Sequence, residues 1–370
     1  PPPLGTTVVR IRSKGTLLVD ASAIRTIEAV LAIPSLAQYA IAANATMRFG
    51  AGTEVFGPIH SNGGIRFDGL AHNVVSSAVA NYNDPDHSGG NEFGVHTHVA
   101  PVDPLPPAAV PVRTNVFIAG RQFPVPAIDF VGLTADLAQI KADAQAGGNY
   151  FAASGSQGYH IVLKINDTFD LYRVTSLAAL PSGCTNLLSQ QNWGSWSVQN
   201  QVLLGTYPFP ANGLVFVEDH VWVDGQINTA RLTIAAGRFP DDAAQRKSIT
   251  VNNNLLYTNY DGQDSLALIA QNNINNGLVS ADTYRIDAAL VAQNGRVGRF
   301  YYRPPSGGSQ RCSPYHIRNT ITLYGMLATN QRYGFAYTDG TGYQIRNIIY
   351  DNNFLYGPPP SFPLTASEYR

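Results

Sequence analysis

The stretch that decides the fold runs from residue 212 to residue 332. It begins NGLVFVEDHVWVDGQINTARLTIAAGRFP (212–240), continues SITVNNNLLYTNYDGQDSLALIAQNNINNG (248–277) and DTYRIDAALVAQNGRVGRFYYRP (282–304), and ends HIRNTITLYGMLATNQR (316–332). Short apolar segments alternate with Asn, Gly and Asp, and none has the length or the 3.6-residue spacing of a helix. The pattern therefore predicts stacked strands.

The centres of these apolar segments recur at a rough step. Ile234, Ile249, Ile269 and Leu290 are 15, 20 and 21 residues apart, and Leu323 follows 33 residues later, which indicates an insertion in that turn. A step of about 20 residues is what a coil of strands needs for each rung to cover the one before it. We therefore expect a β-solenoid.

Turn asparagines keep the same step, because Asn253, Asn273 and Asn294 are 20 and 21 residues apart. Asn tolerates left-handed backbone angles, and its amide can bond to an identical amide one rung away. An internal Asn ladder would hold the rungs in register. The alternative is that Asn is simply a common turn residue.

Composition favours a turn-rich β protein outside the cell. Only 13% of the residues are charged and the net charge is −1, so the whole molecule does not attract nucleic acid or anionic membrane. The two cysteines, Cys184 and Cys312, could form a disulfide in an oxidising compartment or remain free thiols. The sequence contains no run of roughly 18 apolar residues.

The chain divides into a base of two strands and a short helix (1–45), first solenoid rungs (46–80), inserted loops (81–211), the main solenoid (212–332) and a C-terminal segment that returns to the base (333–370). We expect the short helix of the base at 35–43. Within the inserted loops, VGLTADLAQIKADAQAGG predicts a helix at 133–146 capped by Thr134, and GYHIVLKINDTFDLYRV predicts a hairpin around Asn166 and Asp167.

Four segments together carry a resemblance to a known family. They are GTEVFGPIHSNGGIRFDG (52–69), IDFVGLTADLAQIKADAQ (128–145), DAALVAQNG (287–295) and LYGMLATNQRYGFAYTDGTGYQIRNIIYDNNFLYGPPPSFP (323–363). In this order they resemble the large minor pilins and pilus-assembly proteins of bacterial type IV pilus systems, which carry a β-solenoid on a pilin-like base, as in competence-type minor pilins.

The resemblance implies a mainly β fold: a solenoid on a small pilin-like antiparallel sheet, with one or two short helices. It also implies a subunit of an extracellular fibre at the cell surface, whose partners are other pilin subunits. In that family an apolar N-terminal helix attaches the subunit to the membrane and then to the fibre. These 370 residues do not contain such a helix, so the resemblance implies membrane contact only through a segment outside them.

The loop Asp84-Pro85-Asp86-His87-Ser88-Gly89, with Asn91 and Glu92 after it, has oxygen ligands at alternate positions. A short loop wraps Ca²⁺ in this way, so Asp84, Asp86, Ser88, Asn91 and Glu92 are candidate calcium ligands and calcium is the candidate cofactor. Pro85 and the absence of a Glu at the twelfth position count against the site.

His96 and His98 lie on one face of a strand, and His60, His72 and His87 precede them. A zinc site needs three or four converging ligands. Nothing in the spacing makes these histidines converge, so surface or turn histidines are the favoured interpretation.

Trp193 and Trp196 could stack a sugar ring or a base, although tryptophans of this kind more often pin a long loop to the protein body. Arginines lie near aromatic residues late in the chain, at positions 296, 299, 303, 311, 318 and 332. Of these, Arg296, Arg299 and Arg303 are candidate contacts to DNA or polysaccharide. The alternative is a charged solenoid edge that resists strand addition.

No enzyme motif stands out, since the sequence has no GxSxG, HExxH or phosphate-binding glycine loop. We therefore expect a non-enzymatic minor or tip subunit of a type IV pilus-like fibre, displaying a β-solenoid for adhesion or subunit contacts. A module that binds DNA or polysaccharide is the second hypothesis. A β-helix polysaccharide lyase or hydrolase is the third.

Overall fold

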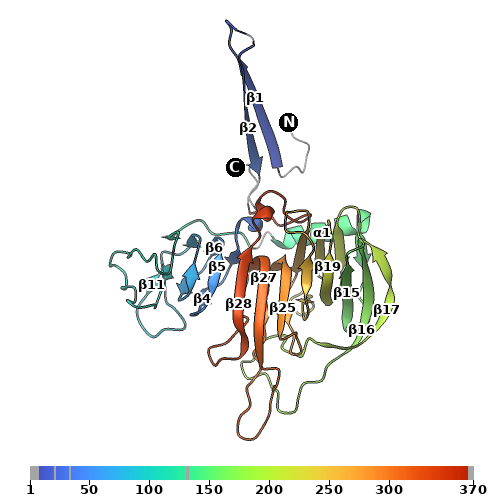
Figure 1. Ribbon diagram of the computed structural model, residues 1–370. Helices are drawn as coiled ribbons and strands as arrows, with labels where there is room; N and C mark the ends of the chain where they lie inside the picture. Colours follow the sequence, from blue (N-terminus) through green and yellow to red (C-terminus); the bar gives the residue numbers. More distant parts are fainter. Residues whose placement is uncertain (1–7, 21, 33–34, 131–132, 366–370) are drawn as a thin grey trace.

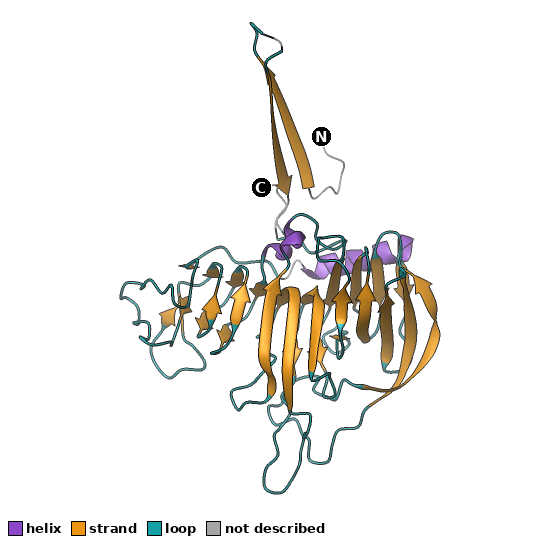
Figure 2. Ribbon diagram, in the orientation of Figure 1, coloured by secondary structure: helices purple, strands orange, loops and turns teal. Residues whose placement is uncertain are grey.

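The computed structural model describes residues 8–20, 22–32, 35–130 and 133–365. Within them the chain is mainly β, as predicted. Short parallel strands stack into a long solenoid, a two-stranded hairpin stands off its side, and one α-helix lies along it (Figures 1 and 2). No helix among these described residues is long and apolar enough to span a membrane.

The hairpin consists of β1 (Val8–Thr16) and β2 (Ile24–Ala32), paired antiparallel with Val9 opposite Leu31. Since strand residues alternate between faces, one face carries Val9, Ile11, Ile27, Ala29 and Leu31. The opposite face is charged: Glu28 forms ion pairs with Arg10 at 3.0 Å and with Arg12 at 2.9 Å. The hairpin is therefore amphipathic, and its apolar face is not covered by the solenoid (Figure 1).

In the described residues, one face of the solenoid is a parallel sheet of ten strands, each in register with the next. In spatial order they are β14 (Asn149–Phe151), β18 (Leu214–Val217), β20 (Arg231–Ala236), β23 (Ser265–Ala270), β25 (Thr283–Ala292), β27 (Ile317–Thr329), β3 (Ile41–Ala43), β6 (Ile59–Ser61), β9 (Val75–Ser77) and β13 (Arg121–Gln122). Apart from the end strands β14 and β13, the buried side chains of this sheet are mostly Ile, Leu, Val and Ala, which is typical of a parallel sheet covered on both sides.

Two further faces close the coil. One contains β19 (Val221–Ile227), β21 (Ile249–Thr250), β24 (Ile274–Asn276) and β26 (Val297–Arg299), followed by β4 (Met47–Phe49), β7 (Ile65–Phe67) and β12 (Val95–His96). The other runs through β15 (Gly158–Lys164), the end of β19, β22 (Leu255–Tyr257), the first halves of β25 and β27, β28 (Gly342–Tyr350), β5 (Glu54–Phe56) and β8 (Leu70–Ala71).

Long strands turn the corner between faces at glycine. Gly325 in β27 has φ +146°, and a Cβ there would lie 2.1 Å from the carbonyl oxygen of Ala288 on the neighbouring strand β25. Only a residue without a side chain allows the two backbones to approach this closely. The packing of adjacent rungs therefore requires glycine at this corner.

The chain enters the solenoid in its middle. β27 pairs with β3, and β28 pairs with β5, so the first rungs of the sequence continue directly from the last ones. From β3 the chain builds outward to β13, returns along the solenoid, and starts again at the other end with β14 (Figure 1). The two ends of the solenoid segment meet at the base of the hairpin, where Leu36 N donates to Pro363 O at 3.1 Å.

The return path contains α1 (Leu133–Gly147), which overlaps the predicted helix. Leu137, Ile140 and Ala144 are buried at helical spacing against β14, β18 and β20. The helix ends at Gly147, and Gly148 then packs tightly on Leu214, where a Cβ would lie 2.4 Å from the carbonyl oxygen. Thr134, predicted as the cap, lies inside the helix instead, because α1 begins at Leu133.

The predicted rung step of about 20 residues is wrong for most of the solenoid. Ile234 pairs with Leu268, Leu268 with Leu290, and Leu290 with Leu327, which are steps of 34, 22 and 37 residues. Ile249 belongs to a different face and pairs with Ile274. The predicted rung length was too short because successive apolar segments were assigned to one face of the solenoid. Each rung in fact contains several short strands that lie on different faces.

The predicted Asn ladder is also wrong in its residues. Asn253 bonds to Asp224, Asn273 accepts from the Arg296 N–H, and Asn294 donates to Gln271 O, so the three amides do not contact one another. An Asn ladder does occur at the junction of the two halves: Asn62 donates to Asn44 at 2.8 Å, and Asn44 donates to Asn330 at 2.6 Å.

The short helix expected at 35–43 is reduced to one 3-10 turn, η1 (Leu36–Gln38), capped by Ser35. Residues 41–43 form β3 instead, because Ile41 is fully buried between Leu327 and Ile59 and pairing on both sides overrides the helix preference of Ala. The segment 81–211 was expected to be inserted loops, but it also contains strands of the solenoid. Between β11 (Glu92–Phe93) and β16 (Thr168–Leu177), the strands β12, β13, β14 and β15 pair with solenoid strands.

The end of the solenoid beyond β15 is closed by an antiparallel extension. β15 and β16 form the predicted hairpin around Asn166 and Asp167, and β17 (Val198–Pro208) continues the sheet. β10 (Asn81–Tyr82) pairs with β11 near the opposite end, and η2 (Asn352–Leu355) follows β28. A disulfide joins Cys184 to Cys312 and fastens the loop 181–200 to the solenoid.

Candidate metal centre

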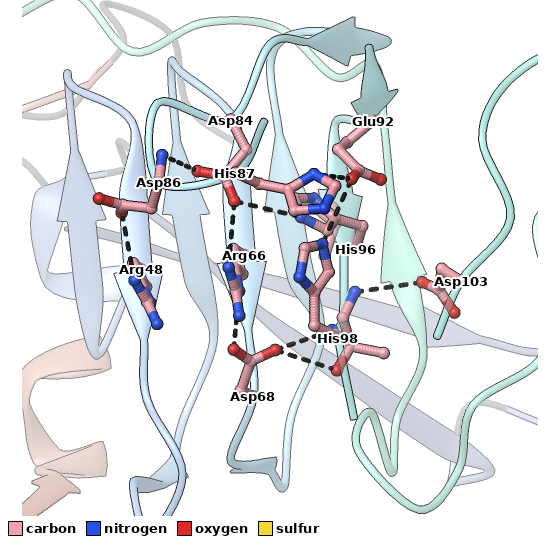
Figure 3. A network of polar contacts seen from close by, with 12 residues as sticks. Arg48, Arg66, Asp68, Asp84, Asp86, His87, Glu92, His96, His98 and Asp103 are labelled. Carbon is pink, nitrogen blue, oxygen red and sulfur yellow. Dashed lines mark hydrogen bonds and ion pairs between the residues drawn. The ribbon is translucent and has the colours of Figure 1, made fainter. Parts of the chain in front are cut away.

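Five ionisable side chains gather beside the loop after β10. β10 and β11 pair with Tyr82 opposite Glu92, so the intervening loop folds back and brings Asp84 and His87 near Glu92. β12 pairs with β7, which fixes His96, and His98 follows two residues later. Figure 3 shows the three imidazoles lying between the carboxylates of Asp84 and Glu92.

The distances are short around Glu92. Its Oε1 lies 3.2 Å from His87 Nδ1 and 3.3 Å from His98 Nε2. On the other side of the cluster, His96 Nε2 lies 3.7 Å from Asp84 Oδ2. Two sets of ligand atoms, from Asp84, His96 and His98 and from His87, Glu92 and His98, each lie within 4.8 Å of one another. His98 belongs to both sets.

The backbone behind the histidines is held by a network of acidic groups. Asp68 Oδ1 accepts from His98 N at 2.8 Å, and Asp103 Oδ2 accepts from Thr97 N at 3.2 Å (Figure 3). Arg66 lies between Asp68 at 2.7 Å and Asp84 at 3.6 Å. The imidazoles of His96 and His98 are therefore placed by a fixed backbone, whereas His87 lies on the loop between β10 and β11.

The cluster is deeply buried yet incompletely bonded. Asp84, Glu92 and His96 are at most 2% exposed. Among the described residues, Asp84 Oδ2, Glu92 Oε2 and both ring nitrogens of His96 have no hydrogen-bond partner. Leaving such atoms unpaired costs about 1–3 kcal/mol each. Burial lowers the pKa of His96 below its usual value, and the Glu92 and Asp84 carboxylates oppose this shift.

The predicted calcium ligands do not all join this cluster. Asp86 points away from the imidazoles towards Arg48, with which it forms an ion pair at 3.8 Å (Figure 3). It also forms an ion pair with Arg332 at 2.5 Å. Ser88 and Asn91 are exposed on the loop. Asp84 and Glu92 are in the cluster, but imidazoles rather than further oxygen ligands surround them.

His60 and His72, the other two histidines that the sequence singled out, have ordinary partners. His72 pairs with Glu54 at 2.7 Å, and His60 bonds to Ser76 and Asn62. His96, in contrast, is fully buried, so it is not the surface histidine that the sequence favoured. The convergence of His87, His96 and His98 was missed in the sequence because it depends on the pairing of β10 with β11. These strands have only two residues each, too few to be recognised in the sequence.

The two candidate tryptophans fix their loop to the protein body. Trp193 Nε1 donates to Tyr301 O at 2.9 Å, and Trp196 Nε1 donates to Asn192 O at 2.8 Å. Trp196 also packs against Trp222, with the ring centroids 6.1 Å apart. This arrangement matches the loop-pinning interpretation of these residues.

The candidate arginines do not form an exposed strip. Arg299 is fully buried, and its guanidinium donates to the carbonyl oxygens of Leu278 and Tyr315 at 2.9 and 2.7 Å. Arg296 donates to the Tyr337 hydroxyl at 3.2 Å, and Arg303 donates to Thr185 Oγ1 at 2.8 Å. Arg299 in particular holds loops together rather than facing a ligand.

A groove of about 510 Å³ lies where the two halves of the solenoid meet. Four arginines contribute to its lining, Arg48, Arg296, Arg332 and Arg346, together with Tyr333 and Tyr337. Asp86 is the acidic residue among its lining residues. The groove joins residues far apart in the sequence, which is why the sequence indicated only some of them.

Comparison with known proteins gives little beyond this description. No protein-family model matches the chain, and no curated protein matches it. Among solved structures, the competence-associated pilin ComZ from Thermus thermophilus is similar over 98% of this chain and 80% of its own, with 13% sequence identity and a TM-score of 0.34. A likeness at that level carries no argument about function.

Proposed function

We propose that this chain is a non-enzymatic subunit of an extracellular, type IV pilus-like fibre at the cell surface, where its solenoid mediates adhesion or subunit contacts. The β1–β2 hairpin is the observation that supports this role. An isolated two-stranded hairpin is marginally stable in water. Its apolar face carries Ile11 and Ile27, which are 48% and 67% exposed. Such a face favours packing against another subunit.

The body of the protein suits a structural role. Backbone groups in each rung bond to the rungs on either side, which makes the solenoid stiff. Because residues 36 and 363 meet at the base of the hairpin, the solenoid is a lobe that projects from a docking element. The hairpin would hold the lobe in the fibre, and the loops of the lobe would meet other surfaces.

Charge variants on the two hairpin faces test this proposal. Ile27→Asp places a charge on the apolar face, and Thr26→Asp places one on the opposite face as a matched control. Cells expressing each variant are sheared, and the chain is quantified in the purified fibres. We expect I27D to be depleted and T26D to be retained. Equal incorporation of I27D, T26D and the unchanged protein would argue against docking through the hairpin.

The arginine groove favours a second function, binding of a polyanion such as DNA or an acidic polysaccharide. The test titrates a labelled single-stranded oligonucleotide and an oligogalacturonate at rising salt. An Arg332→Gln/Arg346→Gln variant should weaken binding, whereas Arg231→Gln, outside the groove, should not. Absence of binding at low salt would remove this function. Turnover of pectin-like substrates would instead favour the β-helix enzyme.

A further inference from the structure

The cluster beside the loop after β10 has more ligand atoms than hydrogen bonds. Buried histidines and carboxylates are normally paired with one another or with backbone groups. Here both nitrogens of the fully buried His96, and one oxygen each of Asp84 and Glu92, lack a hydrogen-bond partner in the described part of the chain. Something that accepts several lone pairs at once would satisfy them.

We propose that this cluster binds one divalent transition-metal ion of the zinc class. His87 Nδ1, Glu92 Oε1 and His98 Nε2 are three of its ligands, and His96 supplies the fourth, with Asp84 beside it. The ion is a structural one that fastens the loop 84–92 to the end of β12.

The spacing of the atoms suits such an ion. Zinc lies about 2.0–2.1 Å from its ligands, so the ligand atoms of a tetrahedral site are about 3.3 Å apart. The observed separations of Glu92 Oε1 from His87 Nδ1 and His98 Nε2 are 3.2 and 3.3 Å. His96 and His98 offer ligand atoms within 4.8 Å of each other, so His98 links the two sides of the cluster.

The types of ligand atom in the cluster favour zinc over calcium. Ca²⁺ takes six to eight oxygen ligands, whereas imidazole suits zinc and its transition-metal neighbours. Three of the five side chains are imidazoles, and the calcium candidates Asp86, Ser88 and Asn91 lie outside the cluster.

The surroundings of the cluster match a metal site in two further respects. His98 N and Thr97 N are fixed by Asp68 and Asp103, which orients the ligands from behind. The side chain of His87 is 40% exposed, so an ion can reach the cluster from solvent past this residue. The competing explanation is a set of histidine–carboxylate ion pairs without metal.

Metal binding to the purified, EDTA-treated chain distinguishes the two explanations. Titration with Zn²⁺ should give one equivalent and a higher melting temperature, and Co²⁺ should give the visible absorption of a tetrahedral complex. Glu92→Gln and His98→Gln should weaken Zn²⁺ binding by tenfold or more. His72→Gln, which alters an ordinary histidine–glutamate pair, is the matched control and should leave binding unchanged.

If His98→Gln fails to fold, His87→Gln provides the same test at a more exposed ligand and should also weaken binding. The absence of Zn²⁺ binding, equal affinity in the ligand variants and the control, or a response to Ca²⁺ instead of Zn²⁺ would each overturn the proposal.

Discussion

Asn44 Nδ2 donates a hydrogen bond of 2.6 Å to Asn330 Oδ1, although 286 residues separate them. This bond crosses the seam at which the first rungs of the sequence join the last ones. Asn62 extends it to a third rung. The seam is continuous, because β3 and β5 pair with β27 and β28 in full parallel register. The solenoid is therefore one stack built from two separate parts of the chain.

The seam should be as important to stability as any interior rung. Ile41 is fully buried between Leu327 and Ile59, so Ile41→Ala removes packing on both halves at once. We expect a loss of about 2–4 kcal/mol in the free energy of unfolding, measured with denaturant. Ile345→Ala, on exposed β28 surface, is the control and should change little. If Ile41→Ala and Ile345→Ala both change the free energy of unfolding only slightly, the packing across the seam does not contribute to stability as proposed.

The Cys184–Cys312 bond should stabilise the loop 181–200. The two cysteines are 128 residues apart in sequence, so the crosslink restricts a large part of the unfolded chain. Replacing both with Ser should cost about 2–5 kcal/mol and lower the melting temperature. A reducing agent should lower the melting temperature of the natural chain and leave the double variant unchanged. An unchanged melting temperature on reduction would speak against this role.

Arg299 should tolerate no substitution, including lysine. Its planar guanidinium serves the carbonyl oxygens of Leu278 and Tyr315 as well as Ser280 Oγ, and an ammonium group cannot reach them all. We expect Arg299→Lys to cost about 3 kcal/mol or more. Arg303→Lys, a more exposed position, should cost less than about 0.5 kcal/mol. If Arg299→Lys and Arg303→Lys unfold at the same denaturant concentration, the hydrogen bonds of Arg299 to Leu278, Tyr315 and Ser280 do not contribute to stability as predicted.

His220 should make stability depend on pH. Burial lowers the pKa of His220 to about 4, and its Nδ1 accepts a hydrogen bond from Ser248 N at 3.1 Å. The pKa of His220 is lower in the folded than in the unfolded state. The stability that the neutral, buried His220 contributes to the folded state is therefore complete above pH 6.5 and is lost as the pH falls towards 4. We expect the natural chain to lose on the order of 2 kcal/mol more than His220→Asn between pH 7 and pH 4. Parallel pH profiles would refute the prediction.

The mainly β fold, the hairpin at the start and the helix at 133–146 follow from local patterns in the sequence. Val9 and Ile11 alternate with charged residues, and Leu137, Ile140 and Ala144 recur at helical spacing. These signals lie within one element, so a single sequence is enough to find them. The sequence left open whether Cys184 and Cys312 form a disulfide or remain free thiols, and the structure joins them.

Features that depend on distant pairing could not be found in this way. Nothing in Ile41-Ala42-Ala43 reveals that its neighbours are Leu327 and Ile59. The sequence divided the candidate metal cluster into a calcium loop and a pair of surface histidines, because the fold rather than the spacing brings His87 and Glu92 to His98. The rung step was misjudged for the same reason.

Docking of the hairpin into a fibre is the central functional proposal, and it is tested most directly by site-specific photocrosslinking in cells. A photoreactive amino acid at Ile27 samples the apolar face, and one at Val112, an exposed loop residue of the solenoid, serves as the control. Mass spectrometry of the crosslinked products should identify a pilin subunit joined through position 27 and none through position 112. No crosslink at position 27, or the same products at both positions, would contradict the proposal.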